Sequence, residues 1–128
     1  MALAVLDASA LIALLRDEPG ADIVANYAGD ALISTVNLQE AIKVLVADGV
    51  SEKVARDMLS PLNLEFRAHE ADDAWAAAML CPATKSKGSG LGDRTCMALA
   101  IAVGLPAITT DRAWGELTIP GLRVILAR

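Results

Sequence analysis

The chain has 128 residues, the size of one ordinary domain, and 55% of them are hydrophobic while only 3% are aromatic. A chain of this length buries enough surface to fold without disulfides or a structural metal, so we expect a single domain over residues 1–128. The formal charge of −5 argues against a protein that binds nucleic acid through basic side chains alone. Divalent cations held by acidic side chains would reverse that sign locally.

The two cysteines, Cys81 and Cys96, lie in no Cys-x-x-Cys pattern and have no histidine near them in sequence. We therefore expect both to be buried apolar residues in a reducing compartment rather than metal ligands. Apolar runs such as residues 97–103 are too short to span a bilayer. Asp7 interrupts the apolar start of the chain, which argues against a signal peptide. These features predict a soluble cytoplasmic protein.

Short apolar runs alternate with longer segments of helical spacing along the whole chain. In the first half the expected elements are a strand at residues 2–6, helices at 10–15 and 21–27, a strand at 31–35, a helix at 37–48, and a helix from Ser51 that ends before Pro61. In the second half they are a strand at 62–66, a helix at 70–80, a flexible loop at 85–90, a helix at 92–103, a strand at 107–110, a short helix after Asp111, and a strand at 122–126.

Strands that alternate with helices connect through right-handed crossovers and form a mostly parallel sheet with helices on both faces. We expect an α/β fold of the Rossmann-like, three-layer type with about five strands. Strands covered on both faces should be continuous apolar runs, as residues 2–6 and 107–110 are. Ligands of such folds bind beyond the carboxyl ends of the strands. Asp7 and Asp111 each follow a strand directly, so both are expected at that edge.

Each of four acidic residues has an ordinary structural explanation. Asp7 and Asp111 lie between a strand and a helix, where Asp is a favoured N-cap. Asp93 lies at the start of a predicted helix, where the helix dipole stabilises a carboxylate. Glu40 follows Asn37 by three residues, which is the spacing of a capping box with Asn as the cap.

The same four carboxylates are harder to explain together. In the expected fold Glu40 projects from the first turn of the helix after the second strand, and Asp93 from the first turn of the helix that leads into the fourth strand. Both then meet Asp7 and Asp111 at one edge, where the four carboxylates repel one another unless some take up protons or a cation binds. Ligation by oxygen alone favours Mg²⁺ or Mn²⁺ over Zn²⁺. The sequence therefore predicts a divalent metal site at this edge.

Four segments, in order, resemble the motifs of PIN domains. They are residues 5–11, 37–40, 91–100 and 105–114, and together they span nearly the whole chain. A single short segment that contains an Asp is common by chance, whereas four in the right order at this chain length are specific. The similarity is greatest to the VapC toxins of bacterial and archaeal toxin–antitoxin pairs.

The resemblance implies a PIN-like fold and a Mg²⁺- or Mn²⁺-dependent endoribonuclease that hydrolyses RNA phosphodiester bonds. It implies a homodimer that a cognate antitoxin protein neutralises. The metal ligands that it implies are Asp7, Glu40, Asp93 and Asp111. Ser9 and Thr110 match positions with supporting polar roles. A metal in such a site lowers the pKa of a bound water and acts as a Lewis acid, and which carboxylate orients the water stays open.

Other residues have weaker functional interpretations. Arg94 and Arg112 each follow an expected metal ligand and are candidates for contacts with substrate phosphates. The one histidine, His69, lies outside every motif, which argues against acid–base catalysis by imidazoles and against a Ser-His-Asp triad. Trp75 and Trp114 have positions that suit burial between helices or a dimer contact.

Two other protein classes begin with a strand that ends in Asp. A haloacid-dehalogenase-like phosphatase needs a second Asp two residues later, where this chain has Ser9. A response-regulator receiver needs an acidic pair at the first strand, where this chain has Ala8 beside Asp7. Two alternatives within the PIN fold stay open. One is a catalytically silent module that only binds a partner, and the other is a metal-dependent nuclease that acts on DNA, since contacts to the 2′-hydroxyl group are not readable from the sequence.

Overall fold

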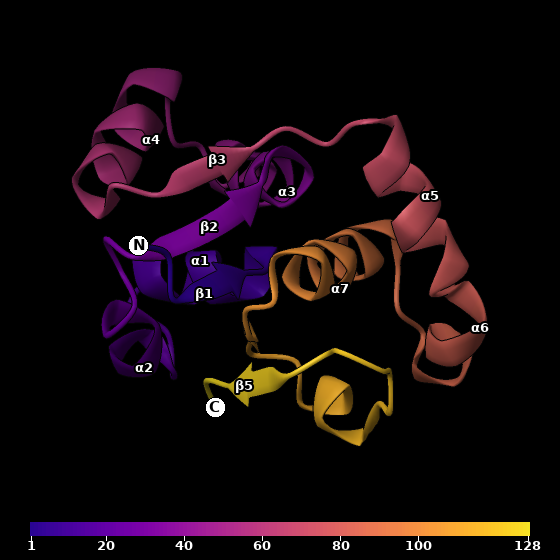
Figure 1. The fold of residues 1–128 in the computed structure, drawn as a ribbon. Helices are drawn as coiled ribbons and strands as arrows, with labels where there is room; N and C mark the ends of the chain where they lie inside the picture. Colours follow the sequence, from indigo (N-terminus) through magenta and orange to yellow (C-terminus); the bar gives the residue numbers. More distant parts are fainter.

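The computed structural model describes all 128 residues (Figure 1). Its elements in chain order are β1 (Ala4–Leu6), α1 (Ala8–Leu15), α2 (Ala21–Ala25), β2 (Ala31–Ser34), α3 (Thr35–Ala47), α4 (Glu52–Leu59), η1 (Ser60–Leu62), β3 (Glu65–Arg67), α5 (Ala71–Met79), α6 (Cys81–Thr84), η2 (Lys85–Lys87), α7 (Leu91–Val103), β4 (Ala107–Thr109), η3 (Arg112–Glu116) and β5 (Val124–Leu126).

The five strands form one sheet in the order β3-β2-β1-β4-β5, and every neighbouring pair is parallel. Strand β1 lies at the centre, where Val5 is in register with Leu32 of β2 and with Ala107 of β4. The predicted α/β fold with a parallel sheet of five strands is confirmed. The carboxyl ends of β1, β2 and β4 lie side by side, so the residues that follow them share one edge of the sheet.

Alternation along the strands divides the interior into two cores, one on each face of the sheet. Leu6, Ile33 and Ile108 point to the face covered by α1, where they pack with Leu11 and Val24. Val5, Leu32 and Ala107 point to the opposite face, where they pack against Met97 of α7 and against Trp114. Because both faces are covered, the strands at the centre contain no exposed residue. The result is the predicted three-layer arrangement, with α5 packed on the outside of α7 (Figure 1).

The third strand lies further along the chain than the apolar pattern predicts. Pro61 is part of the 3-10 turn η1, and Asn63 then adopts a left-handed conformation with φ of 49°. The extended segment therefore starts only at Glu65, and β3 is an exposed edge strand rather than an apolar run. The predicted loop at residues 85–90 also differs, since η2 forms at Lys85–Lys87 before the chain turns at Gly88.

The expectation that both cysteines are buried was wrong for Cys81. Cys81 is exposed and Cys96 is buried, so only the second behaves as a core residue. Trp75 is 69% exposed on α5, whereas Trp114 is 1% exposed within the core on the α7 side. No helix combines the length and the apolar character that crossing a membrane requires.

Candidate active site

Asp7 is the buried acidic residue of the carboxyl edge, and it follows β1 directly. It is 4% exposed. Its Oδ1 accepts hydrogen bonds from the Ala10 backbone N–H at 2.8 Å and from Ser9 Oγ at 2.7 Å. Its Oδ2 accepts a hydrogen bond from Thr109 Oγ1 at 2.6 Å. Asp7 is therefore the N-cap of α1, as its position predicts, but an N-cap does not need to be this deeply buried.

Burial in these surroundings raises the pKa of Asp7 from 3.8 to about 6. Desolvation of the carboxylate is the main cause, and the negative charge of Asp93 adds to it. The hydrogen bonds from Thr109, Ala10 and Ser9 oppose the shift without cancelling it. A buried carboxyl group whose pKa is raised by desolvation and by a nearby charge is a candidate for a functional residue.

Of the two hydroxyl residues to which the resemblance gives a supporting role, Ser9 hydrogen-bonds Asp7 and Thr110 does not. The Ser9 hydroxyl donates to Asp7, lies 3.3 Å from Thr109 Oγ1, and accepts the Thr110 backbone N–H at 3.0 Å. The side chain of Thr110 makes no hydrogen bond, and Thr109 has the supporting role instead. The sequence signal for Thr109 is a hydroxyl inside an otherwise apolar buried strand, since such a group needs a hydrogen-bond partner.

Glu40 lies one turn deeper in its helix than predicted, because α3 starts at Thr35 with Ser34 as its N-cap. The capping box that begins at Asn37 was therefore wrong. Asn37 is instead a buried residue of the helix, and its Nδ2 donates to Glu40 Oε1 at 2.8 Å and to the Gly92 carbonyl at 2.9 Å. This pair of bonds brings the Glu40 carboxylate to the start of α7.

Asp93 lies in the first turn of α7, as predicted, and its Oδ2 accepts the Gly90 backbone N–H at 2.9 Å. Cys96 lies one turn further along this helix and is fully buried. Burial raises the pKa of the Cys96 thiol well above its usual range, and the charges of Asp7, Asp93 and Glu40 raise it further. Three of the four expected carboxylates therefore lie close enough to act on one buried group.

Asp111 is the one expected ligand that is less closely connected to the others. It is an exposed residue whose Oδ1 accepts the Ala113 backbone N–H at 3.0 Å, as an N-cap of η3. Its own backbone N–H donates to Thr109 Oγ1 at 3.0 Å, so Thr109 joins it to Asp7. No hydrogen bond joins the Asp111 carboxylate to the other three acidic side chains.

These residues fit a divalent cation in donor type and in charge, although they are not gathered into a ready-made site. No group of three or more His, Cys, Asp or Glu side chains is close enough to hold a metal ion. The charge of Asp93 nevertheless acts on Asp7, whose raised pKa shows that ionisation of its carboxyl group is disfavoured in these surroundings. A cation would reverse that preference, because a positive charge stabilises carboxylates. Oxygen is also the donor that Mg²⁺ and Mn²⁺ prefer.

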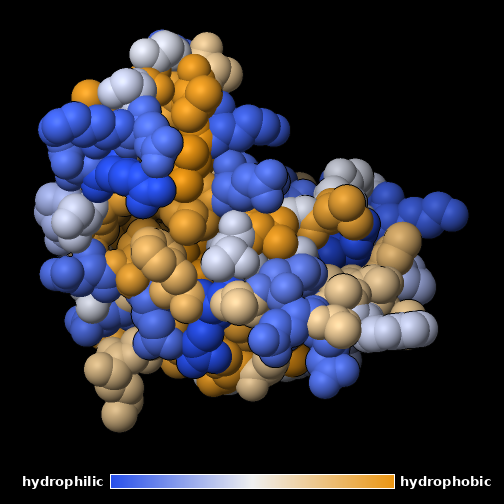
Figure 2. All heavy atoms as spheres, turned by 90° about the horizontal axis from the view of Figure 1, so that it is seen from above, coloured by the Kyte–Doolittle hydropathy of each residue, from blue (hydrophilic) through white to orange (hydrophobic).

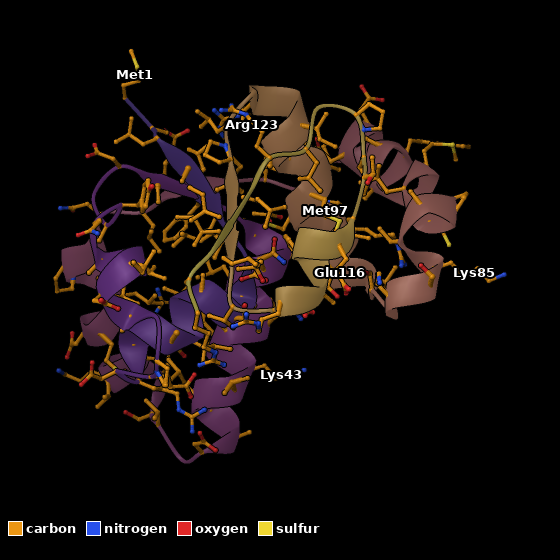
Figure 3. All side chains as sticks on the ribbon, turned by 90° about the horizontal axis from the view of Figure 1, so that it is seen from below. Met1, Lys43, Lys85, Met97, Glu116 and Arg123 are labelled. Carbon is orange, nitrogen blue, oxygen red and sulfur yellow. The ribbon has the colours of Figure 1, made fainter.

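The arginines of this edge differ in what they contact. Arg94 is partly buried, and its Nη1 donates to the Ser89 carbonyl at 2.6 Å, so it fixes the loop before α7. Arg112 is exposed and makes no hydrogen bond or ion pair. In the view from below, Glu116 of η3 faces the segment that carries Lys85 (Figure 3), and it forms an ion pair of 3.2 Å with Lys87. His69 lies outside the site, between β3 and α5.

Solved structures share this fold over the whole chain. The chain is similar to one in a DNA-bound VapBC complex from Salmonella typhimurium, with a TM-score of 0.75, 19% identity and full coverage of both chains. It is similar to a chain in a toxin–antitoxin complex from Klebsiella pneumoniae, with a TM-score of 0.73, 19% identity and 98% of each chain covered. A VapBC-5 structure from Mycobacterium tuberculosis matches with a TM-score of 0.60 and 22% identity, over 98% of this chain and 99% of that one.

A comparison with curated protein sequences finds no significant match. The family model of the PIN domain, in contrast, matches residues 4–119, a stretch that starts at β1 and extends past η3. That stretch contains the four expected acidic residues, the Asn37 and Thr109 contacts, and most of both cores of the sheet. The protein therefore belongs to the PIN domain family of nucleases.

Proposed function

We propose that the protein is a Mg²⁺- or Mn²⁺-dependent endoribonuclease of the VapC toxin type, which acts in the cytoplasm and is neutralised by an antitoxin protein. One observation carries the proposal. Asp7 is buried at the carboxyl end of the central strand with both oxygens bound by neighbours, and Asp93 and Glu40 lie close enough for their charges to act beside it. A purely structural N-cap does not need other acidic side chains nearby.

The residues that would hold the cation are Asp7, Glu40, Asp93 and Asp111. Such a cation supplies Lewis acidity toward the phosphate and a bound water of lowered pKa. The chain itself orients Asp7 through Ser9 and Thr109, so that the carboxylate keeps one position. It orients Glu40 through Asn37 and Asp93 through the Gly90 N–H. The side chain of Asp111 is exposed, and Thr109 joins its backbone to Asp7.

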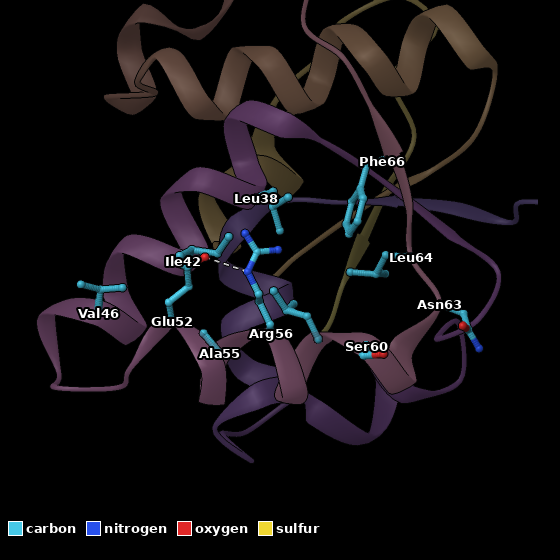
Figure 4. A pocket seen from close by; sticks show the side chains of 11 residues that line it. Leu38, Ile42, Val46, Glu52, Ala55, Arg56, Ser60, Asn63, Leu64 and Phe66 are labelled. Atoms are coloured by element: carbon cyan, nitrogen blue, oxygen red, sulfur yellow. Dashed lines mark hydrogen bonds and ion pairs between the residues drawn. The ribbon is translucent and has the colours of Figure 1, made fainter.

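An apolar groove beside the site supports a protein partner. The groove has a volume of about 790 Å³ and lies between α3, α4 and β3, where its hydrophobic lining consists of Leu38, Ile42, Val46, Ala55, Leu59, Leu64 and Phe66. Figure 4 shows Leu38 and Phe66 pointing into it from different elements, next to Arg56, which is ion-paired with Glu52. On the face seen in Figure 2, which carries α4 and β3, hydrophobic side chains form a band flanked by hydrophilic ones.

Apolar patches rimmed by polar side chains are common at sites where proteins bind one another. Because the similar solved chains come from toxin–antitoxin complexes, we propose the antitoxin as the partner that covers the groove. Leu38, Ile42 and Val46 of the groove lie on the same helix, α3. We also propose a homodimer, which light scattering after size exclusion would detect as twice the chain mass.

Cleavage of RNA by the purified, antitoxin-free protein tests the proposed function. A mixed pool of structured and single-stranded RNA is incubated with Mg²⁺, Mn²⁺ or EDTA, beside a matched pool of DNA. The Asp93→Asn variant removes one charge of the site, and the Asp30→Asn variant removes one charge at the opposite edge of the sheet. Asp30 is exposed and its side chain has no hydrogen-bond partner, so it is a suitable control.

We expect the protein to cleave RNA only when Mg²⁺ or Mn²⁺ is present. The cleavage should be lost in Asp93→Asn and retained in Asp30→Asn. Cleavage of DNA with the same pattern would establish the nuclease that acts on DNA instead. A folded protein that cleaves neither pool, and that binds no Mn²⁺ in calorimetry, would establish the module that only binds a partner.

A further inference from the structure

Asn37 joins the two helices that carry Glu40 and Asp93. It is 1% exposed in α3, at the point where α3 packs against α7. Its side-chain amide has two N–H groups, and both are used: one for Glu40 Oε1 at 2.8 Å and one for the Gly92 carbonyl at 2.9 Å. A single side chain therefore ties the Glu40 carboxylate to the residue immediately before Asp93.

The orientation of this amide is determined by its partners. Both are acceptors, so only the NH₂ group can face them. The reversed amide would place the Asn37 side-chain oxygen against the oxygens of Glu40 and Gly92. The remaining atom, Oδ1, is buried and has no hydrogen-bond partner. A buried acceptor without a partner destabilises a fold, and such groups in native proteins call for an explanation beyond stability.

Gly92 provides the complementary space. A Cβ added at this residue would overlap the carboxylate of Glu40, so the carboxylate lies directly against the backbone of α7. Glu40 is only partly buried and would otherwise have the rotamer freedom of an ordinary Glu on a helix. Asn37 limits that freedom through its hydrogen bond to the Glu40 carboxylate. Gly92 contributes because it has no side chain, which leaves room for the carboxylate in this one position.

We propose that Asn37 is a positioning residue that presents the Glu40 carboxylate beside Asp93 for binding a divalent cation. The proposal rests on the proposed function, because it concerns the cation of that site. A merely structural tie between α3 and α7 would affect stability alone. A positioning residue must also affect cation affinity, since neighbours that orient a ligand typically contribute about 10-fold to 100-fold to metal affinity.

The test is Mn²⁺ affinity, measured by calorimetry on the full chain without RNA. Asn37→Leu keeps the branched shape of the side chain and removes both donors. Thr84→Val is the matched control, because Thr84 is fully buried in α6 and its hydroxyl donates only to the Leu80 and Cys81 carbonyls. Gly92→Ala is the second variant, which displaces the Glu40 carboxylate while it keeps Asn37 and gains helix propensity.

We expect Asn37→Leu and Gly92→Ala each to weaken Mn²⁺ binding about 10-fold or more. The Mn²⁺ affinity of Thr84→Val should stay within about two-fold of that of the unmodified protein, even if Thr84→Val lowers Tm as much as the other two variants do. If the unmodified protein binds Mn²⁺ and folded Asn37→Leu binds it equally well, the positioning role is overturned. If Asn37→Leu does not fold, unchanged Mn²⁺ affinity in Gly92→Ala overturns it instead. An unmodified protein that binds no Mn²⁺ would overturn both the positioning role and the proposed function.

Discussion

Thr109 donates its hydroxyl to Asp7 Oδ2 at 2.6 Å, between residues that are 102 positions apart in the chain. The two residues come from the ends of the neighbouring parallel strands β4 and β1. The same oxygen of Thr109 accepts the Asp111 backbone N–H at 3.0 Å. The buried hydroxyl of Thr109 therefore fixes both the Asp7 side chain and the backbone at Asp111.

Thr109→Val removes this hydroxyl and keeps the shape of the side chain. Asp7 Oδ2 loses its donor and the Asp111 N–H loses its acceptor, so we expect a loss of about 1–3 kcal/mol in the free energy of unfolding. The control is Thr110→Val, whose hydroxyl makes no hydrogen bond and whose removal should change stability by less than about 0.5 kcal/mol. Urea denaturation of both variants measures the difference, and equal losses would contradict the role of Thr109.

The raised pKa of Asp7 predicts that the metal-free protein becomes less stable as pH rises. The pKa is about 6 in the fold and 3.8 in the unfolded chain, so between these values the folded protein binds more protons. The stability that the protonated form contributes is present at acid pH and is lost as pH rises through about 6. The loss from this residue is of order 3 kcal/mol. Chemical denaturation in EDTA from pH 3.5 to 7.5 measures it.

Asp7→Asn is the control for this pH dependence. The amide cannot ionise, its Oδ1 can still accept from Ala10, and its NH₂ group can donate to Thr109. We expect the variant to be more stable than the unmodified protein at pH 7.5, to show a flatter pH profile of stability, and to lack nuclease activity. A profile as steep as that of the unmodified protein would assign the titration to another group.

The fold and the placement of Asp7, Asp93 and Asp111 were predictable because they depend on local patterns. A buried apolar run followed by Asp and then by helical spacing places a carboxylate at the end of a strand, and no long-range information is needed. The start of α3 was not predictable in this way. Ser34 and Asn37 are both good N-caps, and only the tertiary contact of Asn37 with Gly92 puts the second one inside the helix.

Thr109 was missed for a similar reason. The resemblance points to Thr110, whereas the hydrogen bond of Thr109 to Asp7 depends on the pairing of β4 with β1. Thr109 and Thr110 are identical in type and adjacent in sequence, and strand alternation decides which of them faces Asp7. Likewise, nothing local distinguishes Cys81 from Cys96. One lies on the short outer helix α6 and the other on the buried side of α7.

Arg94→Gln should loosen the loop that precedes α7. The guanidinium donates to the Ser89 carbonyl at 2.6 Å, and the shorter amide of Gln does not reach it. We expect tryptic cleavage after Lys87 to become several-fold faster, because that bond lies next to the released segment. The control is Arg112→Gln, which removes an arginine with no contact in the fold and should leave the rate unchanged. A rate unchanged in both variants would show that Lys87 and Glu116 alone fix the loop.

Arg112→Gln should weaken RNA binding without affecting the fold. Arg112 is exposed, directly follows Asp111 and makes no hydrogen bond or ion pair, so it is free to contact a phosphate. A lost phosphate contact reduces the slope of log Kd against log salt by about 0.7 for a single strand. Fluorescence anisotropy with a short RNA, in an Asp93→Asn background that prevents cleavage, measures both quantities. Arg56→Gln on α4 is the control for net charge, since Arg56 lies in the groove and is paired with Glu52. We expect the slope to change only for Arg112→Gln, and an equal change in both would indicate a general effect of charge instead of a contact at this edge of the sheet.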